Sequence, residues 1–164
     1  MARPLFAKRP PTAAWFHYAA LTAALLGDHG RAATILVDGL ASHPHAAALY
    51  NNLAVVRERQ GHFDDALSMA EKGIQEDLAL AQLHKNHGDL LYRLGRYDDA
   101  SESYQRAVKA DPDLGDDVYL KLGNIRFRRR ERDEAVRMWE RALELDPDNA
   151  IVRTNLESVR QVLS

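Results

Sequence analysis

The sequence predicts an all-helical protein built from a repeated pair of helices. Three glycines recur at intervals of 34 residues, and three alanines keep the same interval: Gly27, Gly61, Gly95, Ala32, Ala66 and Ala100. The segment GHFDDA that begins at Gly61 returns one period later as GRYDDA. Because two sets of markers share one period, we expect four helix–turn–helix repeats followed by a final helix.

The four predicted repeats occupy residues 13–46, 47–80, 81–114 and 116–149. The fourth begins after one extra residue, since Gly123 lies 35 residues after Gly88. The first repeat carries His29 at a place where the second and third have an aromatic residue, and the second carries Leu78 where the others have proline. Each copy is degenerate, but the period is kept throughout.

Small and large residues alternate where the two helices of a repeat are expected to cross. In the third repeat, Gly88 and Ala100 allow close approach, and Leu91 and Tyr104 fill the remaining volume. Three aspartates, Asp64, Asp98 and Asp133, are placed at the starts of second helices, where they are predicted to accept hydrogen bonds from free backbone amides.

The two ends of the chain are predicted to differ. At the C-terminus, Val152, Leu156, Val159 and Leu163 form one apolar stripe, which predicts a capping helix over residues 150–164. At the N-terminus, residues 1–12 contain three prolines and are expected to form an extended or disordered arm.

The composition limits the classes of function. The formal net charge of −2 and a pI near 6.4 do not favour a nucleic-acid binder. The absence of cysteine excludes disulfides and thiolate zinc sites. The apolar stretch over residues 13–26 is shorter than the roughly 20 residues needed to cross a bilayer, so no membrane insertion is expected. Cytoplasm is the default compartment.

The repeats resemble the tetratricopeptide repeat family. The residues that carry the resemblance are clearest in the third repeat: Gly88, Leu91, Gly95, Tyr97, Ala100, Tyr104, Ala107 and Pro112. The resemblance implies a right-handed superhelix of stacked helix pairs, whose first helices line a concave groove that holds an extended peptide or a partner's helix. It therefore implies an adaptor or scaffold that binds a protein or peptide partner, and no enzymatic activity.

Helical spacing indicates which residues of the first helices face this groove. The predicted groove residues are Asn52, Glu58, Arg59, Lys85, Asn86, Asp89, Tyr92, Arg93, Lys121, Asn124, Phe127 and Arg128. Arg59, Arg93 and Arg128 occupy equivalent places, and such a row favours carboxylates, so an acidic or C-terminal peptide segment is the expected ligand. The alternative is that these arginines are solvated helix ends paired with nearby carboxylates.

The first repeat presents a different surface. Its outward face is apolar and comprises Trp15, His17, Tyr18, Leu21 and Leu25. Such a face can bind a partner's hydrophobic side chain, mediate self-association or be covered by the chain's own N-terminal arm. The alternative function is therefore a structural subunit that is assembled into a larger complex through its N-terminal end.

Other site types are less well supported by the sequence. His84 and His87 fall where the repeat packs large side chains, so they are interpreted as packing residues and no metal or cofactor is expected. The basic cluster from Arg126 to Arg132 is interrupted by acidic neighbours. No phosphate-binding loop or nucleophile motif is present. The two-carboxylate clamp of the family's chaperone-tail receptors is not reproduced, because its places on the first three repeats hold His17, Leu21, Asn52, Gln82 and Asn86.

Overall fold

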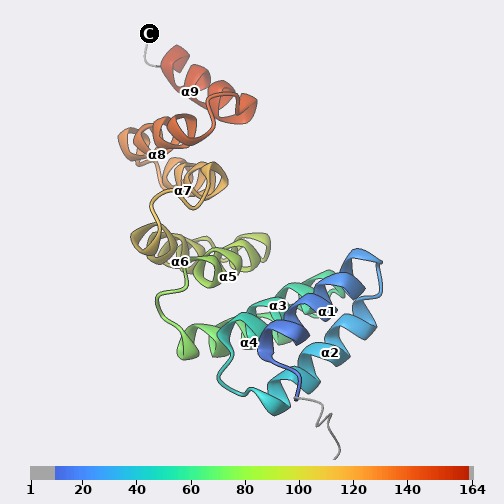
Figure 1. Ribbon diagram of the computed structural model, residues 1–164. Helices are drawn as coiled ribbons and strands as arrows, with labels where there is room; N and C mark the ends of the chain where they lie inside the picture. The colour runs from blue at the N-terminus through green and yellow to red at the C-terminus, as the bar shows by residue number, and fades with distance from the viewer. Residues whose placement is uncertain (1–9, 163–164) are drawn as a thin grey trace, which may run out of the picture. The chain divides into compact units, whose positions relative to one another are not determined.

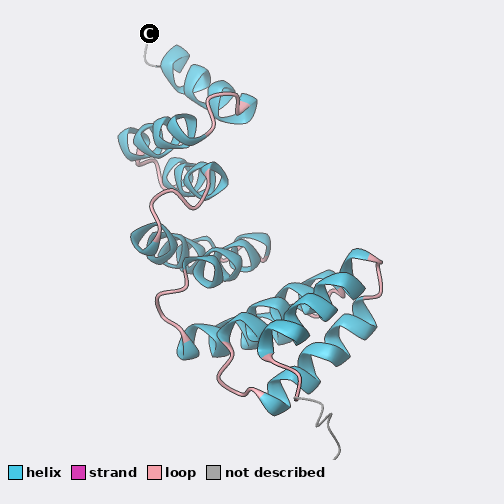
Figure 2. Ribbon diagram, in the orientation of Figure 1, coloured by secondary structure: helices cyan, strands magenta, loops and turns pink. Residues whose placement is uncertain are grey.

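The computed structural model describes residues 10–162, and the regular structure in this range is entirely helical (Figure 2). The helices of this range are α1 (Ala13–Leu25), α2 (His29–Ser42), α3 (Ala47–Arg59), α4 (Phe63–Glu76), α5 (Ala81–Arg93), α6 (Tyr97–Ala110), α7 (Asp116–Arg128), α8 (Arg132–Leu145) and α9 (Ala150–Val162). The predicted all-α class is confirmed. Residues 1–9 of the predicted arm, and Leu163 of the predicted stripe, lie outside the described residues.

The chain divides into two compact units, each with its own set of packed helices (Figure 1). The N-terminal unit, Met1–Glu76, contains α1 to α4, and the C-terminal unit, Asp77–Ser164, contains α5 to α9. Within each unit every helix packs against the next one in the sequence, and α1 also contacts α3. The helices of a pair are antiparallel because a short turn reverses the chain between them.

Close packing inside each pair depends on residues without a bulky side chain. In the C-terminal unit Gly88 of α5 lies against the ring of Tyr104 in α6, and a Cβ at this glycine would lie 2.7 Å from the ring. Gly123 of α7 faces the indole of Trp139 in α8 in the same way. Tyr104 and Trp139 are thereby buried, which confirms the predicted crossing of small and large residues.

The last helix covers one end of the C-terminal unit's core. Val152, Leu156 and Val159 are spaced along one face of α9 and are buried in a cluster with Trp139 and Ala142 of α8. The opposite face of α9 is exposed. The helix therefore closes the apolar surface of the repeat that precedes it.

The helix starts differ in part from the prediction. Asp98 and Asp133 lie in the first turns of α6 and α8, but neither helix has a side-chain hydrogen bond at its N-cap, so their predicted capping role is wrong. Both follow the cap by two positions, and Asp98 instead binds the guanidinium of Arg129. Asp28 does cap α2, since its carboxylate accepts a hydrogen bond from the amide of Arg31 at 2.9 Å.

The turns between paired helices require a left-handed backbone. Gly27, Gly61 and Gly95 provide it, with φ values of 80°, 80° and 74°. In the last pair the same place is held by Arg130, whose φ of 64° makes it the one non-glycine residue with positive φ in residues 10–162. A residue with a Cβ is strained there, because the left-handed conformation brings the Cβ close to a carbonyl oxygen.

The substitution Arg130→Gly is expected to raise the free energy of unfolding by about 0.5–1 kcal/mol. Relief of roughly 1–2 kcal/mol of backbone strain exceeds the entropy of about 0.5–1 kcal/mol that a glycine adds to the unfolded chain. The reverse change in a matched turn, Gly95→Ala, should lower stability by about 1 kcal/mol. Urea unfolding followed by circular dichroism measures both, and a fall in stability for Arg130→Gly would contradict the assignment.

Candidate functional site

Four charged side chains form a closed network between α5 and α7, which we call the charged quartet: Lys85, Asp89, Asp117 and Lys121. Lys85 Nζ lies 2.8 Å from Asp117 Oδ2 and 3.6 Å from Asp89 Oδ2. Lys121 Nζ lies 2.5 Å from Asp89 Oδ1 and 3.4 Å from Asp117 Oδ2. Each lysine therefore contacts both aspartates, and the quartet carries no net charge.

The quartet follows from the order of charges along the two helices. In α5 lysine precedes aspartate by four residues, and in α7 aspartate precedes lysine by four, so opposite charges face each other both along and between the helices. The hydroxyl of Tyr104 in α6 donates a hydrogen bond to Asp89 Oδ1 at 2.7 Å. This bond orients the carboxylate of Asp89 from the α6 side.

The ion pairs and hydrogen bonds of the quartet shift the pKa values of Lys85, Asp117 and Tyr104. Burial alone would raise the pKa of Asp117, but the hydrogen bond and charge of Lys85, with the charge of Lys121, hold that pKa below its ordinary value. Burial would lower the pKa of Lys85, but the two carboxylates raise it. Burial and the neighbouring Asp89 raise the pKa of Tyr104, which keeps its hydroxyl protonated as a donor.

Beside the quartet, an open depression of about 300 Å³ extends from α5 across α7 and α8 to α9. We call it the groove-face depression, and its lining residues are Tyr92, Asn124, Phe127, Arg128, Trp139, Asn155, Ser158 and Val159. Phe127 is 45% exposed even though its ring centroid lies 5.6 Å from that of Trp139. An apolar surface is therefore available to a ligand at this place.

The polar groups of the depression are partly satisfied by one another. The carbonyl oxygen of Asn124 accepts hydrogen bonds from Trp139 Nε1 at 3.1 Å and from Asn155 Nδ2 at 3.2 Å. The amide nitrogen of Asn124 donates no hydrogen bond to any residue in the range 10–162, which leaves it available to a ligand. The guanidinium of Arg128 lies over the ring of Tyr97, 4.2 Å from its centroid.

The structure brings most of the predicted groove residues of the C-terminal unit into the charged quartet or the groove-face depression, and it adds contacts that the prediction lacked. The helical spacing that predicts the groove residues also places Asp117 on this face of α7, but it does not show that Asp117 pairs with Lys85 and Lys121. The opposite order of the two lysine–aspartate pairs is a signal for that pairing. Lys85 and Lys121 are paired and only half-exposed. Asn86 and Arg93 lie on α5, at half-buried and exposed positions respectively, and both interact with neighbouring groups.

The predicted groove residues of the N-terminal unit lie on α3. Asn52 contacts His17 of α1, with 2.6 Å between Asn52 Nδ2 and His17 Nδ1. Glu58 is half-buried and Arg59 is exposed. Arg59 thus belongs to one compact unit and Arg93 and Arg128 to the other, and the row of three arginines stays a prediction.

The apolar face predicted for α1 is largely exposed. Trp15, Tyr18, Leu21 and Leu25 are exposed by 55%, 65%, 46% and 79%. His17 differs from them, because it is half-buried against Asn52. Leu26, which the prediction did not include, extends the apolar surface past the end of the helix.

His84, His87 and one arginine of the basic cluster have structural partners. His84 is buried and its Nε2 lies 3.0 Å from the carbonyl oxygen of Leu78, while His87 Nδ1 lies 2.9 Å from the hydroxyl of Ser103. In the basic cluster, Arg126 pairs with Glu131 at 2.7 Å. Within the described residues, no group of three or more histidine, aspartate or glutamate side chains is placed to hold a metal ion.

No helix in the part of the chain that the structure describes has the length and apolar character needed to cross a membrane.

Replacing Asp117 with asparagine is expected to destabilise the C-terminal unit by about 0.5–1 kcal/mol at pH 7, because a half-exposed carboxylate is partly screened by solvent. The folded-state pKa of Asp117 lies below its ordinary value, so its contribution is present above about pH 4 and is lost as the pH falls through the folded pKa. The difference between wild type and Asp117→Asn should therefore shrink toward pH 3.

The measurement is urea unfolding at both pH values in a Trp15→Phe background, where Trp139 alone reports on the C-terminal unit. A difference that is equally large at the two pH values would show that the charge of Asp117 is not what stabilises the fold.

Models of one protein family match most of the chain. A model described as TPR repeat matches residues 88–129, and two described as tetratricopeptide repeat match residues 17–77 and 116–149. A comparison with curated proteins found no match. The matched ranges together include helices of both compact units.

Solved structures share the fold. The crystal structure of MamA is 20% identical with a TM-score of 0.76, over 84% of this chain and 80% of that one. The structure of pilF from Pseudomonas aeruginosa is 22% identical with a TM-score of 0.79, over 88% and 65%. The first TPR of Spaghetti (RPAP3), solved with the HSP90 peptide SRMEEVD, is 26% identical with a TM-score of 0.66, over 72% and 93%. With this fold and these matches, the chain belongs to the tetratricopeptide repeat family.

Proposed function

We propose that this protein is an adaptor or scaffold that binds a peptide segment of a partner protein on the face formed by α5, α7 and α9. Tetratricopeptide repeats are protein–protein interaction modules, and the similar structure of Spaghetti holds a peptide. The observation that carries the proposal is the groove-face depression, where a half-exposed aromatic ring lies next to a free amide donor.

The chemistry of the depression suits a short polar backbone segment with one apolar side chain. Phe127 offers ring surface for the side chain, and the buried ring of Trp139 packs against Phe127. Asn124 Nδ2 is free to donate to a peptide carbonyl, because its own carbonyl oxygen is held by Trp139 and Asn155. Since the acceptor side of Asn124 is occupied, the orientation of its donor is fixed before a ligand arrives.

Because of the charged quartet, the two lysines contribute less to the expected preference for an acidic ligand than the sequence predicts. Lys85 and Lys121 are already compensated by Asp89 and Asp117, so a run of carboxylates would meet two aspartates as well as two lysines. Arg128 makes no ion pair within residues 10–162, and its stacking on Tyr97 leaves the N–H groups in the guanidinium plane free. We therefore assign the carboxylate preference of the groove-face depression to Arg128.

Affinity capture from a lysate of the source organism, with quantitative mass spectrometry, tests this function. Proteins retained by the wild type should be lost, by at least about tenfold, from Phe127→Ala and from Arg128→Glu, because these remove the apolar surface and the carboxylate-binding group. Arg132→Glu is the matched control, since it makes the same charge change at an exposed position outside the depression.

Circular dichroism should first show that all variants remain folded. If Phe127→Ala and Arg128→Glu retained the same proteins as the wild type and the Arg132→Glu control, the face of α5, α7 and α9 would not be the binding site.

A second candidate function is supported by the exposed face of α1. Trp15, Tyr18, Leu21 and Leu25 give this helix an uncovered apolar surface at one end of the N-terminal unit. Exposed contiguous apolar surface is typical of protein–protein contacts. The protein would then act as a structural subunit that assembles through its N-terminal end.

The solution mass as a function of concentration tests this second function. Self-association through α1 should raise the mean mass of the wild type with concentration, and Leu25→Lys should suppress the rise. Leu78→Lys is the control, because Leu78 is exposed to a similar extent, 73% against 79%, but lies between α4 and α5. A monomer mass that does not change with concentration would exclude self-association.

A further inference from the structure

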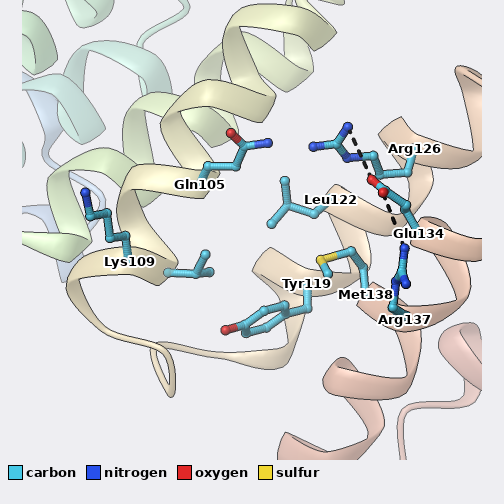
Figure 3. A pocket seen from close by; sticks show the side chains of 9 residues that line it. Gln105, Lys109, Tyr119, Leu122, Arg126, Glu134, Arg137 and Met138 are labelled. Carbon is cyan, nitrogen blue, oxygen red and sulfur yellow. Dashed lines mark hydrogen bonds and ion pairs between the residues drawn. The ribbon is translucent and has the colours of Figure 1, made fainter. Parts of the chain in front are cut away.

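A second depression, of about 400 Å³, lies between α6, α7 and α8 of the C-terminal unit (Figure 3). Its apolar lining comes from three helices: Val108 of α6, Tyr119 and Leu122 of α7, and Met138 of α8. We call it the outer-face depression. Its volume falls within the range of roughly 300–1,000 Å³ that is usual for ligand-binding sites.

The outer-face depression lies on the opposite side of α7 from the groove-face depression. Successive residues of an α-helix are about 100° apart around its axis. Tyr119, Leu122 and Arg126 therefore lie on one side of α7, while the mean direction of Asn124, Phe127 and Arg128 is roughly 160° away. A ligand in one depression does not occupy the other.

The wall of the depression is fixed by contacts of the neighbouring loop. The connection from α6 to α7 has five residues, one more than the connection from α8 to α9. The hydroxyl of Tyr119 donates to the carbonyl oxygen of Pro112 at 2.8 Å, and Arg141 donates to Asp113 at 2.5 Å. The longer loop is thus tied to α7 and α8, so the depression is formed before a ligand binds.

The apolar lining is only partly covered. Leu122 and Tyr119 are buried, whereas Val108 and Met138 are half-buried and form the accessible part. Figure 3 shows the side chains of Leu122 and Met138 between those of α6 and the arginines of α7 and α8. An apolar side chain of a partner would bury this surface, and methionine adapts well to such a contact.

The charges around the depression are not balanced. Glu134 is shared by two arginines, Arg126 at 3.7 Å and Arg137 at 3.3 Å. Lys109, on the opposite rim, makes no ion pair in the part of the chain that the structure describes. Arg126 is also paired with Glu131 at 2.7 Å, so the two arginines face two carboxylates. Lys109 is the remaining positive charge of the lining, and it favours a ligand with a negative charge.

We propose that the outer-face depression is a second protein-docking site, which takes a bulky apolar side chain of a partner together with an adjacent carboxylate that pairs with Lys109. The apolar lining supplies the anchor, and the unpaired ammonium group selects the acidic neighbour. The site is independent of the groove-face depression, so the protein can hold two partners on the two sides of α7.

Selection from a displayed library of random peptides, with the wild-type protein as bait, tests the proposal. One group of selected peptides should combine a bulky apolar residue with a nearby acidic one. These peptides should lose at least about tenfold in affinity for Lys109→Glu and keep their affinity for Phe127→Ala. Arg106→Glu is the matched control, because it reverses an exposed charge on the same helix outside the depression.

Nuclear magnetic resonance locates the peptides independently of any mutation. Their binding should shift the methyl resonances of Met138 and Val108 and leave the side-chain amide of Asn124 unchanged. The proposal is overturned if no selected peptide depends on Lys109, if the peptides that depend on it show no excess of acidic residues, or if the shifts occur at Asn124.

Discussion

The C-terminal unit depends on one steric constraint, the close contact between a glycine of one helix and an aromatic ring of its partner. Gly88 against Tyr104, and Gly123 against Trp139, set how near the paired helices come. The rings fill the space that the missing side chains leave, and the apolar clusters form around them. The same rings also reach the candidate binding face, since Tyr104 donates to Asp89 and Trp139 to Asn124.

The core and the candidate binding face are therefore not separate parts of the molecule. The hydrogen bonds of the two rings orient a carboxylate of the charged quartet and the amide of Asn124 from inside. A change in how a helix pair packs would move these polar groups as well. Core packing thus determines the positions of Asp89 and Asn124 on the candidate binding face. The other surface side chains determine which ligand chemistry would fit there.

The sequence predicted the helices, their period and the crossing of Gly88 with Tyr104. These features depend on a local residue pattern that occurs in four copies, so each copy supports the interpretation of the others. The sequence did not predict that Asp98 fails as a cap or that Arg130 adopts positive φ, because both depend on one side chain in one turn. The groove face was deduced from helical spacing, but spacing cannot show how Lys85 and Lys121 pair across helices. Neither did it indicate the depression beside Lys109, which forms only when three helices meet.

The neutrality of the charged quartet bears on how quickly partners arrive. Alternating charges cancel within a few ångströms, so their field decays much faster with distance than that of an isolated cation. Approaching molecules are consequently not steered toward this face by the quartet, and encounter rates there should stay near the unsteered level of about 10⁵–10⁶ per molar per second. If the proposed peptide binds on this face, the quartet would act only after contact, by favouring a ligand whose charges match its own order.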